Sequence, residues 1–280
     1  MIVKLWGTRG SLASSGPDTV GYGGNTASVE VTGADGTILV LDAGTGIRRL
    51  GAAIDPSVER VDVLLTHLHM DHIQGLGFFA PFFRPAGEIH LWGPASATMD
   101  LRSRLTRYLS PPLFPVQIRD LEARVVLHDA PDQPTDIGGF EVVARHVIHP
   151  GPTVGYRISA DGASLAYLPD HEPALATTHF PAESDWTSGF ELASGVDLLI
   201  HDGQYTDDER RARVGWGHSS VTEAIAFAEL ARAQRLVLFH HDPSHTDAML
   251  DELTAGARET AASIDIACGR EGDRYELAAS

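Results

Sequence analysis

The spacing of apolar residues marks a series of strands along the chain. Residues 2–6, 37–42 and 61–65 are short apolar runs bounded by glycine, proline or charged residues, which is typical of buried strands. The Gly-Ala-Asp-Gly stretch at 33–36 predicts a hairpin turn between residues 26–32 and 37–42. Further strands are predicted at 88–92, 124–128, 140–149, 153–159, 164–168, 196–201 and 235–240.

Apolar residues with helical spacing predict helices between several of these strands. The predicted helices cover residues 47–53, 73–83, 96–109, 220–233 and 246–262. Ser220 and Glu223 have the spacing of a capping box at the start of the fourth. A run of strands followed by a helix occurs twice, which favours an α/β fold with two mixed β-sheets packed face to face and helices outside. We therefore expect an αβ/βα four-layer sandwich in a single domain, residues 1–280.

One loop between a predicted strand and a predicted helix concentrates side chains that bind metals. His67, His69, Asp71 and His72 follow the apolar run 61–65 within a few positions. Imidazole and carboxylate groups suit Zn²⁺, Mn²⁺ or Fe, and loops at strand ends are where α/β folds build sites. A solvated polar turn is the alternative, but it does not explain why four coordinating groups crowd together without a lysine or arginine to neutralise Asp71.

Three more residues of ligand type end predicted strands further along the chain. His149, Asp170 and His240 each follow an apolar or alternating run. Any one of them could be structural, but their shared position at strand ends favours a common site with the first cluster. His146 and His241 lie close by and compete for the same roles. Strand alternation places His146 on the opposite face from His149.

The H-x-H-x-D-H pattern after an apolar strand resembles the signature of the metallo-β-lactamase fold superfamily. This resemblance implies the four-layer fold and two divalent ions, with Zn²⁺ expected and Mn²⁺ or Fe also accepted. It assigns His67, His69 and His149 to one ion, Asp71, His72 and His240 to the other, and Asp170 to a bridge between them. A water shared by two such ions loses a proton near neutral pH and becomes a nucleophile. Asp42 could orient a ligand histidine or cap a turn.

The reaction class is narrowed by further resemblances. Asp170 resembles the bridging aspartate of two-metal hydrolases, a position where the true β-lactamases carry another residue, so antibiotic hydrolysis is disfavoured. His69 stands where the oxygen-reducing diiron members carry glutamate, so an oxidoreductase is disfavoured. Asp202 and His218 are similar to a motif of the ribonuclease Z group and its phosphodiesterase relatives. That similarity implies that Asp202 orients His218, which stabilises phosphate charge or protonates the leaving oxygen. Asp71 completes the expected catalytic set. A turn residue and a polar helix-start residue are the alternative interpretations of this pair.

The chain departs from ribonuclease Z where tRNA would be gripped. Residues 155–158 match the pattern of that group, but only residues 159–166 separate them from the residues that lead to Asp170, which leaves no long arm. The net charge of −17 also disfavours nucleic acid. We therefore expect a small anionic phosphodiester or cyclic nucleotide rather than tRNA. The alternatives are a thioesterase or lactonase of the same fold, or a metal-bound sensor without turnover. The expected substrate contacts are Arg9, His171, Tyr205 and His241.

Composition adds limits on location and assembly. The 280 residues are 43% hydrophobic and contain no apolar run long enough to span a membrane. The first residues enter a strand directly, and the single cysteine, Cys268, fits a reducing cytoplasm and a buried position. Four phenylalanines could form core, a substrate wall or the interface of a homodimer, and core is expected: Phe78, Phe79, Phe82 and Phe83.

Overall fold

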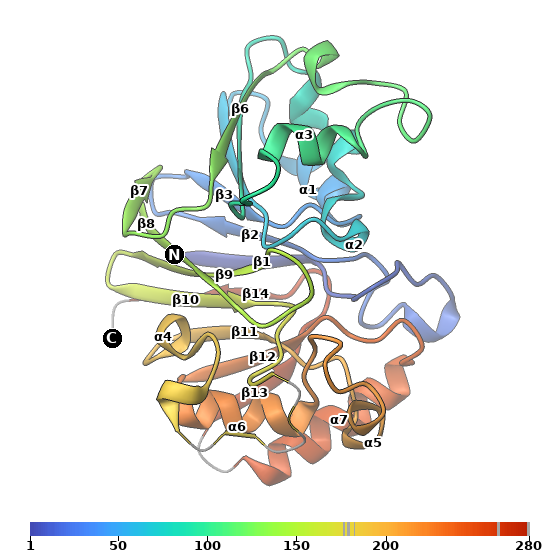
Figure 1. Cartoon of the computed structure of the whole chain (residues 1–280), viewed down its shortest axis with the longest axis vertical. Coiled ribbons are helices and arrows are strands. Elements are labelled where there is room, and N and C mark those ends of the chain that lie inside the picture. The colour runs from blue at the N-terminus through green and yellow to red at the C-terminus, as the bar shows by residue number, and fades with distance from the viewer. Residues whose placement is uncertain (176, 178–179, 182, 262–263, 279–280) are drawn as a thin grey trace.

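Two mixed β-sheets form the centre of the molecule. The computed structural model describes residues 1–175, 177, 180–181, 183–261 and 264–278. Within these residues each sheet has seven strands (Figure 1). The first has the order β14 (Arg274–Glu276), β1 (Ile2–Gly7), β2 (Ser28–Thr32), β3 (Ile38–Leu41), β4 (Arg60–Leu64), β5 (Glu88–Gly93) and β6 (Arg124–Asp129). The second has the order β13 (Asp265–Cys268), β12 (Arg235–Phe239), β11 (Leu198–Asp202), β10 (Ala163–Leu168), β9 (Val154–Ala160), β8 (Phe140–His146) and β7 (Thr135–Ile137).

Helices cover the outer faces of both sheets, which confirms the predicted αβ/βα sandwich (Figure 1). The helices α1 (Ile47–Ala53), α2 (Met70–Ile73) and α3 (Leu101–Thr106) share an apolar core with the first sheet. The helices α4 (Phe190–Ala193), α6 (Val221–Ala231) and α7 (Asp247–Thr260) share another with the second sheet, and α5 (Asp207–Arg211) lies near them. The third core lies between the sheets, where Val3 and Leu41 belong to the same cluster as Ile158 and Phe239.

Parallel pairing gathers several strand ends at one edge of the second sheet. Strands β10, β11 and β12 are parallel neighbours, so their carboxyl ends lie at the same edge. In the first sheet β4 is parallel to both β3 and β5. In open α/β sheets ligands bind outside such carboxyl ends. The residues that follow β4, β10, β11 and β12 are therefore placed for a shared site.

The predicted helix at 73–83 is wrong in length and type. The α-helix α2 ends at Ile73, and two 3₁₀ turns follow, η2 (Leu76–Phe78) and η3 (Ala80–Phe83). The N–H of Gly75 donates to the carbonyl of Ala43 (2.9 Å) instead of continuing α2, and Pro81 has no N–H to donate. Phe79 and Phe82 are buried as expected, whereas Phe78 and Phe83 are 58% and 41% exposed.

The other differences concern ends and short elements. The predicted helix 96–109 shrinks to α3, because the Asp100 carboxylate accepts a hydrogen bond from Ser103 N (2.7 Å) and so starts the helix late. The capping box at Ser220 and Glu223 is present. Helix α7 ends at Thr260, and Ala262 of the predicted range lies outside the described residues. Among the described residues, the α-helices and strands that the pattern did not predict are α4, α5, β7, β13 and β14.

Cys268 is buried at the end of β13, and burial raises the pKa of its thiol to about 11. It therefore packs as a small apolar side chain, as predicted. Among the described residues, we find no helix long and apolar enough to cross a membrane.

Candidate metal centre

The loop after β4 is fixed by its own backbone. Leu65 N donates to the carbonyl of Trp92 (2.8 Å), and Val154 N donates to the carbonyl of Thr66 (2.9 Å), which ties the loop to both sheets. His69 then caps α2, and His72 N donates to His69 O (3.0 Å). This turn buries His67 and His72 and leaves His69 exposed. Residues from one short loop therefore approach one point from several directions.

The first group of possible ligands combines this loop with the second sheet. His67, His69, His149 and Asp170 offer one ligand atom each, all within 4.8 Å of one another. His149 Nε2 lies 3.1 Å from His69 Nδ1. His149 follows β8, and Asp170 follows β10. The structure thus brings together the residues predicted for the first ion.

The second group lies beside the first and shares Asp170 with it. Asp71, His72, Asp170 and His240 also lie within the 4.8 Å limit. His240 Nε2 is 3.3 Å from His72 Nε2 and 3.1 Å from Asp71 Oδ2. His240 follows β12 with a φ of +60°, a conformation that is uncommon for a residue other than glycine. These are the residues predicted for the second ion.

Asp170 faces the two groups with different oxygens. Its Oδ2 lies 3.7 Å from His67 Nε2 and 3.6 Å from His149 Nε2. Its Oδ1 lies 2.9 Å from His72 Nε2 and 3.3 Å from His240 Nε2. One oxygen for each group is the arrangement that a carboxylate needs to bridge two ions.

The donor set fits divalent ions. His67 Nε2 is buried and has no hydrogen-bond partner in the described part of the chain, so its lone pair or proton is unsatisfied. Two ligands at 2.0–2.1 Å from a tetrahedral ion are about 3.3 Å apart, and the nitrogen–nitrogen contacts of 3.1 and 3.3 Å are close to that value. Mixed imidazole and carboxylate donors suit Zn²⁺, Mn²⁺ and Fe.

Groups behind the ligands orient two of the histidines. His149 Nδ1 donates to the carbonyl of Gly217 (2.8 Å), which leaves its Nε2 lone pair for an ion. His72 Nδ1 lies 2.8 Å from Asp42 Oδ2, and this carboxylate also accepts from Thr66 N (2.8 Å) and the Tyr167 hydroxyl (3.0 Å). Asp42 therefore takes the first suggested role, since it orients the candidate ligand His72, and it also holds Thr66 at the start of the loop.

The electrostatics of the centre differ between the two groups. Burial and the neighbouring His72 lower the pKa of His67 well below its usual range, and burial lowers that of His149 to about 4, so both are neutral. Burial also acts to lower the pKa of His72, but Asp170, Asp71 and Asp42 outweigh it and raise the pKa. A cation bound there takes the place of that proton, because ligands bind metals in their deprotonated form.

Asp202 and His218 form a hydrogen-bonded pair at the rim of the two groups. His218 Nδ1 lies 2.7 Å from Asp202 Oδ2, at the end of β11. The His218 ring centroid is 5.0 Å from that of His240 and 4.9 Å from that of His149. Asp202 is fully buried and also accepts from the backbone N–H of Gln204 (3.0 Å) and His171 (3.1 Å). The pair therefore fixes one ring nitrogen of His218 and leaves Nε2 for chemistry.

The structure corrects the substrate contacts expected for Arg9 and His241. Arg9 is fully buried, and its guanidinium donates to the carbonyls of Gly23 (2.9 Å) and His245 (2.6 Å). His241 is 1% exposed, and its Nε2 donates to the carbonyl of Gly269 (2.8 Å). Both side chains therefore hold loops together and are closed to a substrate.

The expected contact at His171 is corrected as well, and so is that at Tyr205, which is 3% exposed. His171 is fully buried, with Nδ1 2.8 Å from His201 Nε2. Tyr205 packs edge-on against the ring of His218, with centroids 5.7 Å apart. His146 is exposed and lies outside both ligand groups, as strand alternation predicts.

Three residues of the site were missed by sequence reasoning. Ser11 N donates to Asp71 Oδ2 (2.7 Å) from a glycine-rich loop that gave no local signal. Gly10 lies against His240, and a Cβ there would come within 2.2 Å of His240 Nδ1. Glu172, 1% exposed, holds the loop before His218, and its only signal was its position two residues after Asp170.

Comparison with known sequences places the chain in a family. A family model described as β-lactamase superfamily domain matches residues 37–241. An uncharacterized protein of Mycobacterium tuberculosis, Rv1339, is 34% identical over 215 residues, which cover 73% of this chain and 70% of the relative. A ribonuclease Z of Myxococcus xanthus is 26% identical over 275 residues, which cover 84% of this chain and 87% of the relative.

Solved structures agree with this placement at the level of the fold. The metallo-β-lactamase fold protein YhfI of Bacillus subtilis is 20% identical, with a TM-score of 0.70 and 98% of each chain covered. The Zn²⁺-bound PqqB of Methylobacterium extorquens is also 20% identical, with a TM-score of 0.70 and 99% and 100% covered. A diphosphatase of the PhnP family is 18% identical, with a TM-score of 0.66 and 99% and 98% covered. The chain therefore belongs to the β-lactamase superfamily, a family of hydrolases, and has the metallo-β-lactamase fold.

Proposed function

We propose that this protein is a metal-dependent phosphodiesterase that acts on a small phosphodiester, such as a cyclic nucleotide. The observation that carries the proposal is the Asp202–His218 pair beside the two ligand groups. Cleavage of a phosphodiester expels an alkoxide, which needs a proton, whereas a thioester expels a better leaving group. A buried carboxylate that orients a histidine is built for that proton transfer.

The ligand residues proposed for the two ions are His67, His69, Asp71, His72, His149, Asp170 and His240. Two divalent ions held there, with Zn²⁺ expected, would polarise phosphoryl oxygens and lower the pKa of water. The Zn²⁺ in the related PqqB structure supports that choice of metal.

The protein's own residues would supply the remaining chemistry. Asp71, which accepts from Ser11 N at 2.7 Å, is held as a carboxylate, because His72 and His240 outweigh burial and lower its pKa. Asp202 keeps the proton of His218 on Nδ1 and stabilises the charged ring. His218 Nε2 would then donate to the leaving oxygen or stabilise charge on the phosphate.

A small substrate is favoured by the shape of the second sheet. Strands β9 and β10 are joined by a turn of Asp161 and Gly162, with φ values of +54° and +75°, so no arm extends from this hairpin. The net charge of −17 opposes binding of a long polyanion. The names of two relatives, ribonuclease Z and a diphosphatase of the PhnP family, support phosphoester chemistry in general.

A comparison of substrate classes tests the proposal. Protein of measured metal content is given bis(p-nitrophenyl) phosphate, a thioester and a lactone under the same conditions, with chelated protein as the control. We expect hydrolysis of the phosphodiester to be clearly preferred and to stop in the chelated sample. Activity on the thioester or lactone alone would show that the Asp202–His218 pair has been misinterpreted.

A further inference from the structure

A tryptophan stands exposed next to the candidate catalytic pair. Trp216 is 61% exposed, although large apolar side chains are usually buried. It lies between α5 and α6, two residues before His218. The proposed chemistry assigns no role to an indole at this position.

The loop that carries Trp216 is held in place on both sides of it. Gly215 N and Gly217 N each donate to the carboxylate of Glu172, both at 3.0 Å. Both glycines have positive φ, +84° and +87°, which only glycine adopts readily. Trp216 N donates to the carbonyl of Arg213 at 3.1 Å. The backbone on each side of the tryptophan is therefore fixed, while its side chain is left outside.

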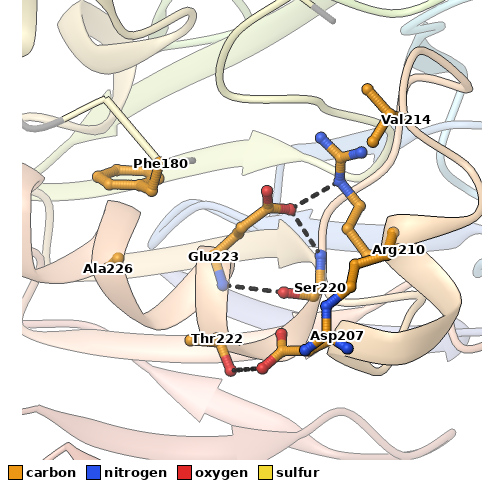
Figure 2. Close-up of a pocket in the computed structure, with 9 residues that line it drawn as sticks. Phe180, Asp207, Arg210, Val214, Ser220, Thr222, Glu223 and Ala226 are labelled. Atoms are coloured by element: carbon orange, nitrogen blue, oxygen red, sulfur yellow. Dashed lines mark hydrogen bonds and ion pairs between the residues drawn. The ribbon is translucent and has the colours of Figure 1, made fainter. Parts of the chain in front are cut away.

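The anchor of this loop is a buried ion pair. Glu172 is 1% exposed and pairs with Arg210 at 2.8 Å. Arg210, 5% exposed, also pairs with Glu223 of α6 at 2.9 Å, and Figure 2 shows its side chain reaching that carboxylate, with Val214 of the loop beside it. Burying charges is costly even when they are paired. A buried ion pair therefore anchors the loop that carries the Trp216 side chain.

The same loop touches the metal centre. The carbonyl of Gly217 accepts from His149 Nδ1 at 2.8 Å, and a Cβ on Gly217 would lie 2.5 Å from that nitrogen. Trp216 precedes Gly217, so its Cα is about 3.8 Å further along the backbone. An exposed tryptophan on a fixed backbone therefore lies one residue from the contact with the candidate ligand His149.

We propose that Trp216 is a stacking platform for the nucleobase of a nucleotide phosphodiester whose phosphate lies at the metal centre. This assignment rests on the proposed function and names its substrate class. Every nucleobase has an aromatic face, and a sugar separates it from the phosphate, which suits an aromatic side chain on a loop beside the candidate ligands rather than among them. Loss of base–aromatic stacking of the usual strength lowers kcat/KM about 5- to 140-fold.

Two substrates with the same leaving group isolate the contribution of the base. They are the p-nitrophenyl esters of methyl phosphate and of thymidine 5′-phosphate. We expect the wild type to prefer the thymidine ester and Trp216→Ala to lose about 5- to 140-fold of that preference, mainly through KM. Trp216→Phe should retain most of it. Trp186→Ala, which removes a tryptophan that is 76% exposed in a different segment, is the matched control.

Fluorescence provides a readout that does not depend on turnover. Titration with thymidine 5′-monophosphate should quench tryptophan emission in the wild type and in Trp186→Ala, and should leave Trp216→Phe without that quenching. Hydrolysis of both esters with an unchanged preference in Trp216→Ala would overturn this assignment alone. Hydrolysis of neither ester by the wild type would overturn the proposed function, and the assignment with it.

Discussion

Asp170 is the residue on which the two ligand groups depend together. Its oxygens face different histidines, Oδ1 toward His72 and His240 and Oδ2 toward His67 and His149. The side chain is 2% exposed, and the nearby histidines outweigh its burial and lower its pKa well below the usual range. A neutral amide of the same shape would keep the packing but could not offer two anionic oxygens.

Asp170→Asn should therefore reduce bound metal from two ions to one or fewer per chain, with an affinity loss of about tenfold or more. Metal analysis after dialysis measures this directly. Asp161→Asn, an exposed substitution in the turn after β9 where asparagine also tolerates the positive φ of +54°, is the matched control. Two ions retained in Asp170→Asn would exclude the bridging role.

His218→Ala should lower turnover of a phosphodiester with an alkoxide leaving group, such as a cyclic nucleotide, about 10²- to 10⁴-fold while both ions stay bound, because the residue is proposed to move a proton rather than to hold a metal. Steady-state kinetics and metal analysis on the same sample separate these effects. His146→Ala, which removes an exposed histidine outside the ligand groups, serves as the control.

Two results would contradict this role for His218. Unchanged turnover would remove the proton-transfer step. Loss of metal would instead favour the third possible ligand group, in which His218 joins Asp202 and His240.

Among the elements, the loop after β1 leaves no room for a larger side chain at Gly10, beside the candidate metal centre. Gly10 lies so close to His240 that a Cβ would come within 2.2 Å of Nδ1 and 2.4 Å of Cε1. The next residue, Ser11, donates its backbone N–H to Asp71. This loop thus supports two ligands of the second group without supplying one.

Gly10→Ala should displace His240 and weaken the second ion while leaving the first group, His67, His69 and His149, in place. Metal analysis should show about one ion lost per chain, and the spectrum of bound Co²⁺ should change. Gly256→Ala in α7, where a Cβ meets nothing within 4 Å, is the control. It should raise stability by about 0.5–1 kcal/mol, as expected for alanine in a helix. Full metal content in Gly10→Ala would contradict this prediction, because it would show that the loop moves aside for the Cβ and leaves His240 in place.

Elements with a strong local pattern could be predicted from the sequence, and those determined by distant contacts could not. Helix 47–53 and the ligand positions at strand ends follow from apolar runs and from side-chain chemistry, and the structure has the helix at those bounds. The region 73–83 has helical spacing, but a hydrogen bond from Gly75 to the distant Ala43 ends the helix early. Burial of Arg9 by carbonyls from residues 23, 242 and 245 likewise has no local signal.

At the scale of the whole molecule, the metal centre joins the two sheets. His67, His69, Asp71 and His72 come from the loop after β4 of the first sheet, and His149, Asp170 and His240 follow strands of the second. Ions that bind both sets should stabilise the native state.

Removal of the ions with a chelator should therefore lower the melting temperature, and added Zn²⁺ should restore it. An ion present at a hundred times its Kd contributes about 2.7 kcal/mol. Differential scanning calorimetry of the loaded, chelated and reloaded protein measures the shift, and Asp170→Asn should show a smaller one. An identical melting temperature with and without ions would argue against a link between the sheets.

Stability should fall in mild acid because of buried neutral histidines away from the ions. Burial lowers the pKa of His201 to about 4, from its ordinary value of 6.5. Below pH 6.5 His201 binds a proton in the unfolded chain but not in the native state. Its contribution to the free energy of unfolding is therefore fully present above pH 6.5 and is lost as the pH falls toward 4. The loss at pH 5.5 is about 1.4 kcal/mol.

Urea unfolding at pH 7.5 and pH 5.5 tests this expectation. His201→Asn retains a donor for the carbonyl of Asp202, which His201 Nδ1 contacts at 2.7 Å, but cannot titrate. Its stability should differ less between the two pH values than that of the wild type, since acid release of metal affects both proteins alike. If the wild type and His201→Asn lose the same stability between pH 7.5 and pH 5.5, His201 is not the source of the loss.

The division of ligands between the sheets also sets an order of events during folding. The first sheet is built almost entirely from the first half of the chain, and only β14 returns to it, pairing with β1. Neither half holds either of the two predicted ligand groups complete, because each of these two needs Asp170 and a histidine from the second sheet together with side chains from the loop after β4. Tight metal capture is consequently a late event, and its kinetics report when the two halves of a newly made chain have closed on each other.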